Sequence, residues 1–219
     1  MILEGKMREK YEKELQNLNS SIISMGKMIE VAIESVILAL MSKDMESLDV
    51  IIANDDAIDE KEKEIEQHCL KILLQQQPVA TDLRMVTAAL KMVTDMERIG
   101  DHAGDIAELI KQLPDFVYNK LSDVHQMGTE IQKMLHDSID AYTNRDVSKA
   151  QDVIAHDDVV DELYHNIKKE LVRQIQENKG DGEQIADYLL IVKYFERIGD
   201  HATNIAEWVI FSITGNLVN

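Results

Sequence analysis

Four pairs of acidic residues share one spacing, in which three residues separate the two acids. Residues four apart lie on one face of a helix, with about 5–6 Å between their Cβ atoms. Carboxylates held that close cannot all stay ionised unless a cation lies among them. A hard metal ion with oxygen ligands satisfies this requirement, so the spacing predicts metal binding. The pairs are Asp55 with Asp59, Glu97 with Asp101, Asp157 with Asp161, and Glu196 with Asp200.

The acids also interrupt stripes of residues that are otherwise apolar. An isolated acidic pair is more often part of a solvated helix face. A carboxylate in an apolar stripe, however, is costly unless it is paired or bound to a cation, and its repetition in the sequence favours metal binding. The first stripe is Leu48, Ile51, Asp55, Ile58, Glu62, Ile65, Cys69 and Ile72, and the second is Leu83, Val86, Leu90, Val93, Glu97 and Gly100.

Glycines stand next to the acids inside the expected helices. Gly100 and Gly199 directly precede Asp101 and Asp200. A glycine inside a helix costs about 1 kcal/mol relative to alanine. Its use at both positions therefore indicates close approach of a second helix, or space for a ligand beside the aspartates.

His102 and His201 follow the aspartates, one residue off the acidic face. A structural or surface role is the commoner one for such a histidine, while a role as metal ligand or phosphoacceptor stays open. The sequence has no Gly-rich phosphate loop, no nucleophile elbow and no His-Glu-x-x-His motif. We therefore predict no catalytic residues and no enzyme activity.

The acidic motifs lie in a sequence repeat. Residues 97–103 and 196–202 both read ERIGDHA, at an offset of 99. Residues 53–60 (ANDDAIDE) and 155–162 (AHDDVVDE) are similar at an offset of 102, so a length difference of three residues falls between the two motifs. A duplicated unit of about 100 residues predicts two equal domains. Pro114 cannot continue a helix, which places the boundary near Leu113 and gives domains of residues 1–113 and 114–219.

Long helices are needed to position these motifs. Apolar residues recur every three or four positions over long stretches, as in amphipathic helices that face a bundle core. Only 5% of the residues are aromatic, which argues against a sheet protein. Short connections favour packing within one chain over a coiled-coil dimer, the competing interpretation. We predict an all-α fold of two tandem three-helix bundles, with six long antiparallel helices over residues 8–42, 45–74, 80–112, 116–144, 146–178 and 182–214.

The chain is strongly acidic, with 41 Asp and Glu residues against 23 Lys and Arg residues and a formal net charge of −18. Nucleic acid would be repelled, because its binding needs phosphate neutralisation by Lys and Arg. Cations and basic protein surfaces are the favoured partners. The single cysteine, Cys69, can form no internal disulfide. No stretch has the length and apolarity of a membrane span or a signal peptide, so we expect a cytoplasmic protein.

The segments ERIGDHAGDIAE and ERIGDHATNIAE, with QPVATDLR before the first, closely resemble the PhoU family. The resemblance covers nearly the whole chain, including its length and its duplication. It implies two three-helix bundles related by a pseudo-twofold axis. It also implies a cytoplasmic accessory protein of the high-affinity phosphate transport system that negatively regulates the phosphate-starvation response. Its partners would be the ATPase subunit of the phosphate ABC transporter and a phosphate-responsive sensor histidine kinase, which would hold it near the inner face of the membrane.

The resemblance further implies multinuclear metal clusters, held by acidic motifs that match the four pairs. The second half departs from the first at two positions. Asn204 stands where Asp105 stands, and Tyr194 stands where Asp95 stands. Fewer anionic ligands predict weaker metal binding in the second half. Candidates for additional ligands are Asp105, Glu108 and Glu207.

Several alternatives stay open from the sequence. Oxygen-only ligands fit iron, manganese, magnesium or calcium, whereas zinc fits less well for want of cysteine or clustered histidine. Clustered metals can activate water, so a metal-dependent phosphohydrolase is an alternative function, as is phosphotransfer through His102 or His201. A bundle that merely oligomerises is a third. For the oligomeric state we expect a homodimer, the commonest assembly.

Overall fold

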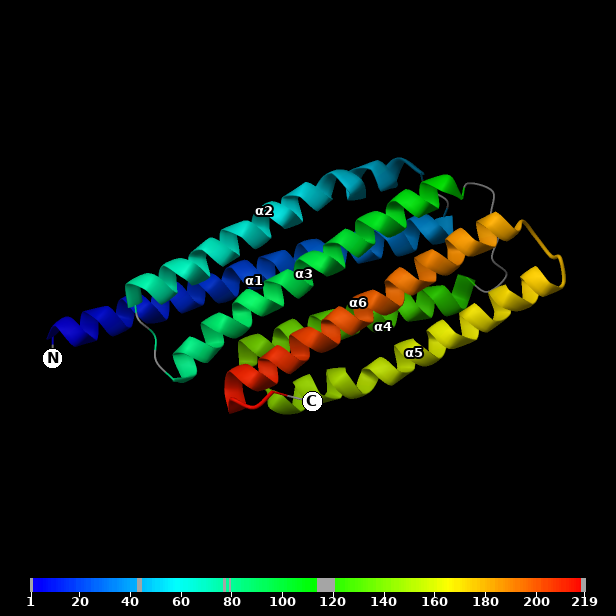
Figure 1. Cartoon of the computed structure of the whole chain (residues 1–219). Coiled ribbons are helices and arrows are strands. Elements are labelled where there is room, and N and C mark those ends of the chain that lie inside the picture. The colour runs from blue at the N-terminus through cyan, green and yellow to red at the C-terminus, as the bar shows by residue number, and fades with distance from the viewer. Residues whose placement is uncertain (1, 43–44, 77, 79, 114–120, 218–219) are drawn as a thin grey trace.

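The computed structural model describes residues 2–42, 45–76, 78, 80–113 and 121–217 (Figure 1). Over these residues the chain forms helices and no strand, which confirms the all-α prediction. Each helix runs antiparallel to the one before it (Figure 1). The helices are α1 Ile2–Ser42, α2 Met45–Gln76, α3 Thr81–Gln112, α4 Leu121–Asn144, α5 Val147–Gln176 and α6 Gly182–Thr214.

Two three-helix units lie side by side. α1, α2 and α3 pack against one another, and α4, α5 and α6 do the same. The units meet along α3 with α6 and along α1 with α4, while α2 and α5 each cover the outside of their own unit (Figure 1). In both contacting pairs, equivalent helices of the repeat meet and run antiparallel, which is the arrangement of a pseudo-twofold axis.

The predicted helix boundaries agree with the observed ones to within two residues wherever both are described, except that α1 begins at Ile2, six residues before the predicted start at residue 8. Pro114, which marks the predicted boundary, and residues 116–120 of the fourth expected helix lie outside the described residues. The division between residues 113 and 114 therefore stays a prediction. One position of a predicted stripe is wrong: Leu83 is 42% exposed, because it lies in the first turn of α3, beside the α2–α3 connection.

Polar caps and a glycine fix the ends of α5 and α6. The carboxylate of Asp146 accepts a hydrogen bond from the backbone N–H of Lys149 (3.0 Å), and that of Asp181 accepts one from Glu183 (2.9 Å). Such N-caps satisfy donors that have no partner within the helix. Gly215 ends α6 with φ of 81°, a left-handed conformation that glycine adopts without strain.

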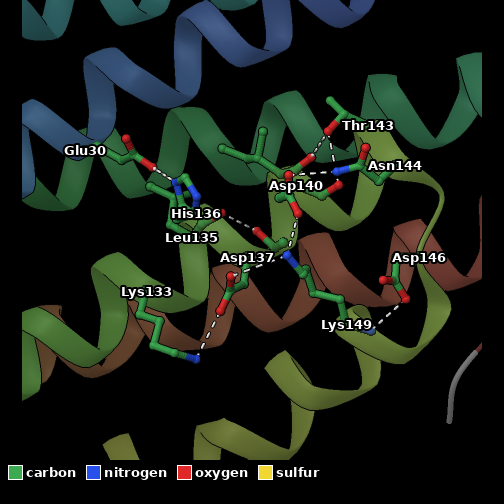
Figure 2. Close-up of polar contacts among 12 residues, drawn as sticks. Glu30, Lys133, Leu135, His136, Asp137, Asp140, Thr143, Asn144, Asp146 and Lys149 are labelled. Carbon is green, nitrogen blue, oxygen red and sulfur yellow. Dashed lines mark hydrogen bonds and ion pairs between the residues drawn. The ribbon is translucent and has the colours of Figure 1, made fainter.

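Ion pairs tie α4 to its neighbours (Figure 2). Lys149 of α5 contacts Asp140 of α4 at the corner between these helices. From α4, Nδ1 of His136 lies 2.9 Å from Oε1 of Glu30 on α1. The second contact crosses from one unit to the other, so polar groups as well as apolar ones join the units.

Two glycines let α1 and α4 approach each other closely. A Cβ atom added at Gly26 would lie 2.3 Å from Cδ1 of Ile139, and one added at Gly128 would lie 2.3 Å from Cδ1 of Ile37. Both distances are shorter than non-bonded carbon atoms allow. Gly26 and Gly128 are 102 residues apart, as are Ile37 and Ile139, so the contacts are equivalent under the repeat. Each unit thus supplies one isoleucine and one glycine to the other.

The apolar residues that recur every three or four positions along α1 lie in the core. The buried residues of this stripe are Leu18, Ile22, Met25, Ile29, Ala32, Val36 and Ala39, and Leu15 is partly buried.

None of the helices in the described residues has both the length and the apolarity to cross a membrane.

Candidate metal centre

α2 and α3 bring acidic residues of the first half together. One carboxylate oxygen from each of Asp59, Glu97 and Asp101 lies within 4.8 Å of the other two. A Cβ atom added at Gly100 would lie 3.0 Å from Cγ2 of Ile58. The glycine therefore permits the close helix approach expected from the sequence, at the level where the two acidic pairs face each other.

A cavity of about 280 Å³ adjoins these acids. A Cβ atom at Gly104 would lie 3.6 Å from Cγ of Asp55, so the absence of a side chain leaves space beside this carboxylate. Acidic groups dominate the wall, which is suited to a cation. The cavity is lined by Ile52, Asp55, Asp101, Gly104, Asp105 and Glu108.

We call Asp55, Asp59, Glu97 and Asp101 the first cluster. Two of its oxygen atoms, Oδ1 of Asp55 and Oε2 of Glu97, are buried and accept no hydrogen bond. Burial, followed by the charge of Asp101, raises the pKa of Glu97 to about 7. Burial, followed by the charges of Asp101 and Asp59, raises the pKa of Asp55 to about 6. Buried polar atoms normally have a partner, and a bound cation would supply one here.

Arg98 offsets part of this charge from the solvent side. Its Nη1 donates to Oδ2 of Asp101 at 2.8 Å, and its Nε lies 3.5 Å from Oε2 of Glu97. The arginine side chain is 54% exposed, so the interaction is worth about 0–1 kcal/mol. Arg98 thus forms ion pairs at the surface of the cluster.

The second half places its acids at the equivalent position on α5 and α6. Burial, followed by the charges of Asp200 and Asp161, raises the pKa of Asp157 to about 6. A Cβ atom at Gly199 would lie 3.4 Å from Oδ1 of Asp157, so this glycine also permits close approach. The acids of the second half therefore lie close enough to repel one another, as in the first half.

The second cluster nevertheless differs, because a lysine that has no counterpart in the first half contacts it. Nζ of Lys193 forms an ion pair with the carboxylate of Glu196. In the part of the chain that the structure describes, three acids offer ligand atoms within 4.8 Å of one another only at Asp59, Glu97 and Asp101. The four acids expected as ligands in the second half are gathered less tightly.

His102 and His201 lie at the interface between α3 and α6. Their ring centroids are 5.5 Å apart, and the ring of His102 is also 5.1 Å from that of Tyr194. His102 is buried, with 8% of its surface exposed. The histidines thus join the two units, which agrees with the structural role expected as the commoner one.

Tyr194 and Asn204, the two residues at which the second half differs from Asp95 and Asp105 of the first, lie at this interface. Nδ1 of His201 lies 2.9 Å from Oδ1 of Asp95, and the amide of Asn204 donates to the same oxygen at 3.0 Å. Nδ1 of His102 lies 3.6 Å from Oδ2 of Asp105. Although the second half has Tyr194 and Asn204 in place of the two aspartates, each histidine still has one carboxylate beside it: Asp105 for His102 and Asp95 for His201. Asp105, expected as a metal ligand, lies between the cavity and a histidine.

Two residues beside the clusters were not predicted as part of them. The charge of Glu62 contributes to the raised pKa of Glu97. Its position in the same apolar stripe as Asp55 was the available signal. Lys193 occupies the position of Thr94 at the repeat offset of 99, so residue-by-residue comparison of the two halves would have identified it.

The donors of the first cluster fit a hard cation. They are all carboxylates, and two of their oxygen atoms are buried and accept no hydrogen bond. Such ligands suit iron, manganese or magnesium, whereas zinc sites are usually built with cysteine or histidine. Asp55, Asp59, Glu97 and Asp101 are the residues that would hold the ion.

Comparisons with known proteins agree with the fold and the repeat. The family model described as PhoU domain matches residues 22–110 and 124–209. A protein from Clostridium acetobutylicum, named phosphate-specific transport system accessory protein PhoU homolog, is 41% identical over 214 residues, which are 97% of this chain and 98% of that protein. A relative of the same name from Streptococcus pneumoniae is 33% identical, over 97% of this chain and 99% of its own.

Solved structures show the same architecture. The crystal structure of PhoU from Pseudomonas aeruginosa superposes with a TM-score of 0.90 at 32% identity, covering 94% of this chain and 100% of that one. The phosphate transport system regulatory protein PhoU from Streptococcus pneumoniae gives a TM-score of 0.90 at 31% identity. The family model matches both units and the relatives align over nearly the full length, so this chain belongs to the PhoU family.

Proposed function

We propose that this protein is a metal-binding regulator of phosphate transport, without catalytic activity of its own. The observation that carries the proposal is the convergence of Asp59, Glu97 and Asp101 beside buried carboxylate oxygens that accept no hydrogen bond. The names of its relatives, which are accessory proteins of phosphate-specific transport systems, support the process in which it acts.

The metal is iron, manganese or magnesium, and the number of carboxylates suits a cluster of more than one ion. Bound ions supply positive charge to acids that otherwise repel one another. The chain positions these acids on two packed helices, which fixes their geometry. The proposed ligands are Asp55, Asp59, Glu97, Asp101 and Asp105 in the first half, and Asp157, Asp161, Glu196 and Asp200 in the second.

The regulator acts as an adaptor. It binds the ATPase subunit of the phosphate ABC transporter and a phosphate-responsive sensor histidine kinase, and it represses the phosphate-starvation response when phosphate is plentiful. A net charge of −18 suits basic surfaces on such partners. It works in the cytoplasm as a homodimer, near the inner face of the membrane through its partners.

Metal content tests the first part of the proposal. The protein is purified without a metal-affinity tag, and its metals are measured by elemental analysis before and after refilling with iron, manganese and magnesium. The variant Glu97→Ala with Glu196→Ala should lose stoichiometric metal, whereas Glu60→Ala, an exposed acid on α2, should keep it. Wild-type protein without metal under every condition would overturn the metal proposal.

Partner binding tests the adaptor role separately. Purified ATPase subunit and the cytoplasmic part of the kinase are each titrated against the metal-loaded and the metal-free chain. Saturable binding that depends on the metal supports the adaptor proposal. Intact metal binding with no affinity for either partner would reject it.

Burial argues against phosphotransfer through His102, one of the two histidines considered for this alternative. His102 is buried beside Tyr194, so a phosphoryl donor could not reach its ring without separating α3 from α6. Release of phosphate from common phosphoesters by the metal-loaded chain would reinstate the hydrolase alternative.

A further inference from the structure

The two acidic clusters have different neighbours at equivalent positions of the repeat. At the offset of 99, Lys193 replaces Thr94; at the offset of 102, Tyr164 replaces Glu62 and Lys168 replaces Glu66. At these three positions the first half carries two acids and a neutral hydroxyl, whereas the second half carries two lysines and a neutral ring. Arg98 contacts Glu97 and Asp101 in the first half, so the difference lies in these three positions and not in the presence of a cation as such.

Lys193 is held in place from two sides. Its Nζ donates to both carboxylate oxygens of Glu196, one turn further along α6. The same ammonium lies 5.2 Å from the centroid of the Tyr164 ring on α5, within the range of a cation–π interaction. Glu196 itself is only 12% exposed, whereas the lysine is 42% exposed. The ammonium group of Lys193 thus contacts the largely buried Glu196, while the lysine side chain as a whole is partly exposed.

Glu196 is the equivalent of Glu97, the most central acid of the first cluster. In the first cluster, Oε2 of Glu97 is buried and accepts no hydrogen bond. In the second, both oxygens of Glu196 already have an ammonium as their partner. Thr203 occupies the position equivalent to Gly104, where the first half has no side chain beside Asp55.

From these contacts we infer that the Lys193 ammonium occupies the cation position of the second cluster, so that this chain binds metal tightly only in its first half. The inference rests on the proposed metal function and makes it specific. An ion entering the second cluster must displace an ion pair and then bind beside the displaced lysine, whose charge repels it. We expect affinity at the second cluster to be at least about tenfold weaker, the effect of about 1.4 kcal/mol.

A reciprocal exchange between the halves tests the inference. Lys193→Thr and Thr94→Lys each install the residue of the other repeat. Binding of Mn²⁺ is followed by equilibrium dialysis and calorimetry in these variants, and in Glu97→Gln and Glu196→Gln, which assign each phase to a cluster. Lys169→Thr, an exposed residue on α5, is the control for net charge.

Wild-type protein should show one tight phase, which Glu97→Gln abolishes and Glu196→Gln leaves unchanged. Lys193→Thr should strengthen the second phase at least about tenfold, and Thr94→Lys should weaken the first by a similar factor. Lys169→Thr should change neither. Two phases of equal affinity in wild-type protein, or no effect of Lys193→Thr beyond that of the control, would overturn the inference and reduce Lys193 to an ordinary surface ion pair.

A metal-free measurement separates this inference from the proposed function. In the chain stripped of metal, Lys193→Thr should lower the melting temperature of wild-type protein but hardly alter that of Glu196→Gln, because the carboxylate is the partner of the ammonium. Absence of Mn²⁺ binding in every variant would reject the metal function. The comparison of melting temperatures would still decide whether Lys193 stabilises the chain through its ion pair with Glu196. Equal effects in both backgrounds would reject the lysine's role.

Discussion

Glu97 combines two properties that conflict in the metal-free protein: its side chain is only 16% exposed, and one buried carboxylate oxygen accepts no hydrogen bond. Its position is best explained by a ligand that the apo chain does not supply. The sequence carried most of this information, because an acid in an apolar stripe is already a signal. What it could not supply was the register between α2 and α3, which decides whether Asp59 or Asp55 faces Glu97 most closely.

Proton binding should make the metal-free protein more stable at mildly acidic pH. Asp55, Glu97 and Asp157 have pKa values of about 6, 7 and 6, above the ordinary range for carboxyl groups. Between pH 4 and 7 the folded chain therefore binds more protons than the unfolded chain, so stability falls as the pH rises through this window. In EDTA, each of these groups should contribute an increase of about 2–4 °C in melting temperature between pH 7.5 and 5.5.

The comparison with Glu97→Gln isolates one of these groups. This variant removes the titration but keeps the shape of the side chain, so its melting temperature should vary less with pH than that of wild-type protein, and in EDTA at pH 7.5 it should be the higher of the two. A wild-type melting temperature that rises with pH in parallel with the variant would contradict the assignment.

Asp95 should contribute to stability through contacts with the other unit. Its oxygen has two partners on α6, His201 and Asn204, and its side chain is only 16% exposed. Asp95→Ala would leave both partners without an acceptor, at a cost of about 1–3 kcal/mol in the free energy of unfolding. Asp95→Asn retains one acceptor and should cost less, as measured by urea denaturation. Equal stability of all three proteins would show that the interface does not depend on this residue.

At the scale of the helices, the periodicity of apolar residues was sufficient to predict the all-α fold and the approximate bounds of each element. Leu83 was assigned to the core wrongly, because periodicity does not reveal where a stripe runs past the end of its neighbours. The close contact of α1 with α4 was also beyond the sequence. Gly26 and Gly128 indicate a close helix contact only once the structure shows that Ile139 and Ile37 pack against them.

Gly128→Ala should separate α1 from α4. The added methyl group would lie 2.3 Å from Cδ1 and 2.7 Å from Cγ1 of Ile37, so the isoleucine cannot escape by moving its terminal atom alone. Overpacking of about 1–3 kcal/mol should exceed the gain in helix propensity of about 1 kcal/mol. Ile37→Val, which removes Cδ1, should partly restore the denaturation midpoint of Gly128→Ala. A variant as stable as wild-type protein would mean that the helices adjust at no cost.

At the scale of the whole molecule, the two units cover each other: α1 of the first unit packs against α4 of the second, and α3 packs against α6. A single unit on its own would leave these contact faces exposed. Residues 1–113 alone should therefore not remain monomeric. The unit carries both Gly26 and Ile37, so two copies can form the contacts that the two units form in the full chain. Light scattering after size exclusion should give twice the mass of the fragment, with a helical circular dichroism spectrum. A folded monomer at high concentration would contradict this prediction.

The paired glycine and isoleucine contacts also bear on how such a chain arises. A protein containing the unit once would be self-complementary, because the isoleucine of each copy fits against the glycine of the other, as in an isologous dimer. In a dimer encoded by a single gene, every substitution appears in both copies. Once two copies are fused into one chain, each can diverge while the contact between them persists. The differences between Thr94 and Lys193 and between Glu62 and Tyr164 are of this kind, because a symmetric dimer would carry the same residue at both clusters.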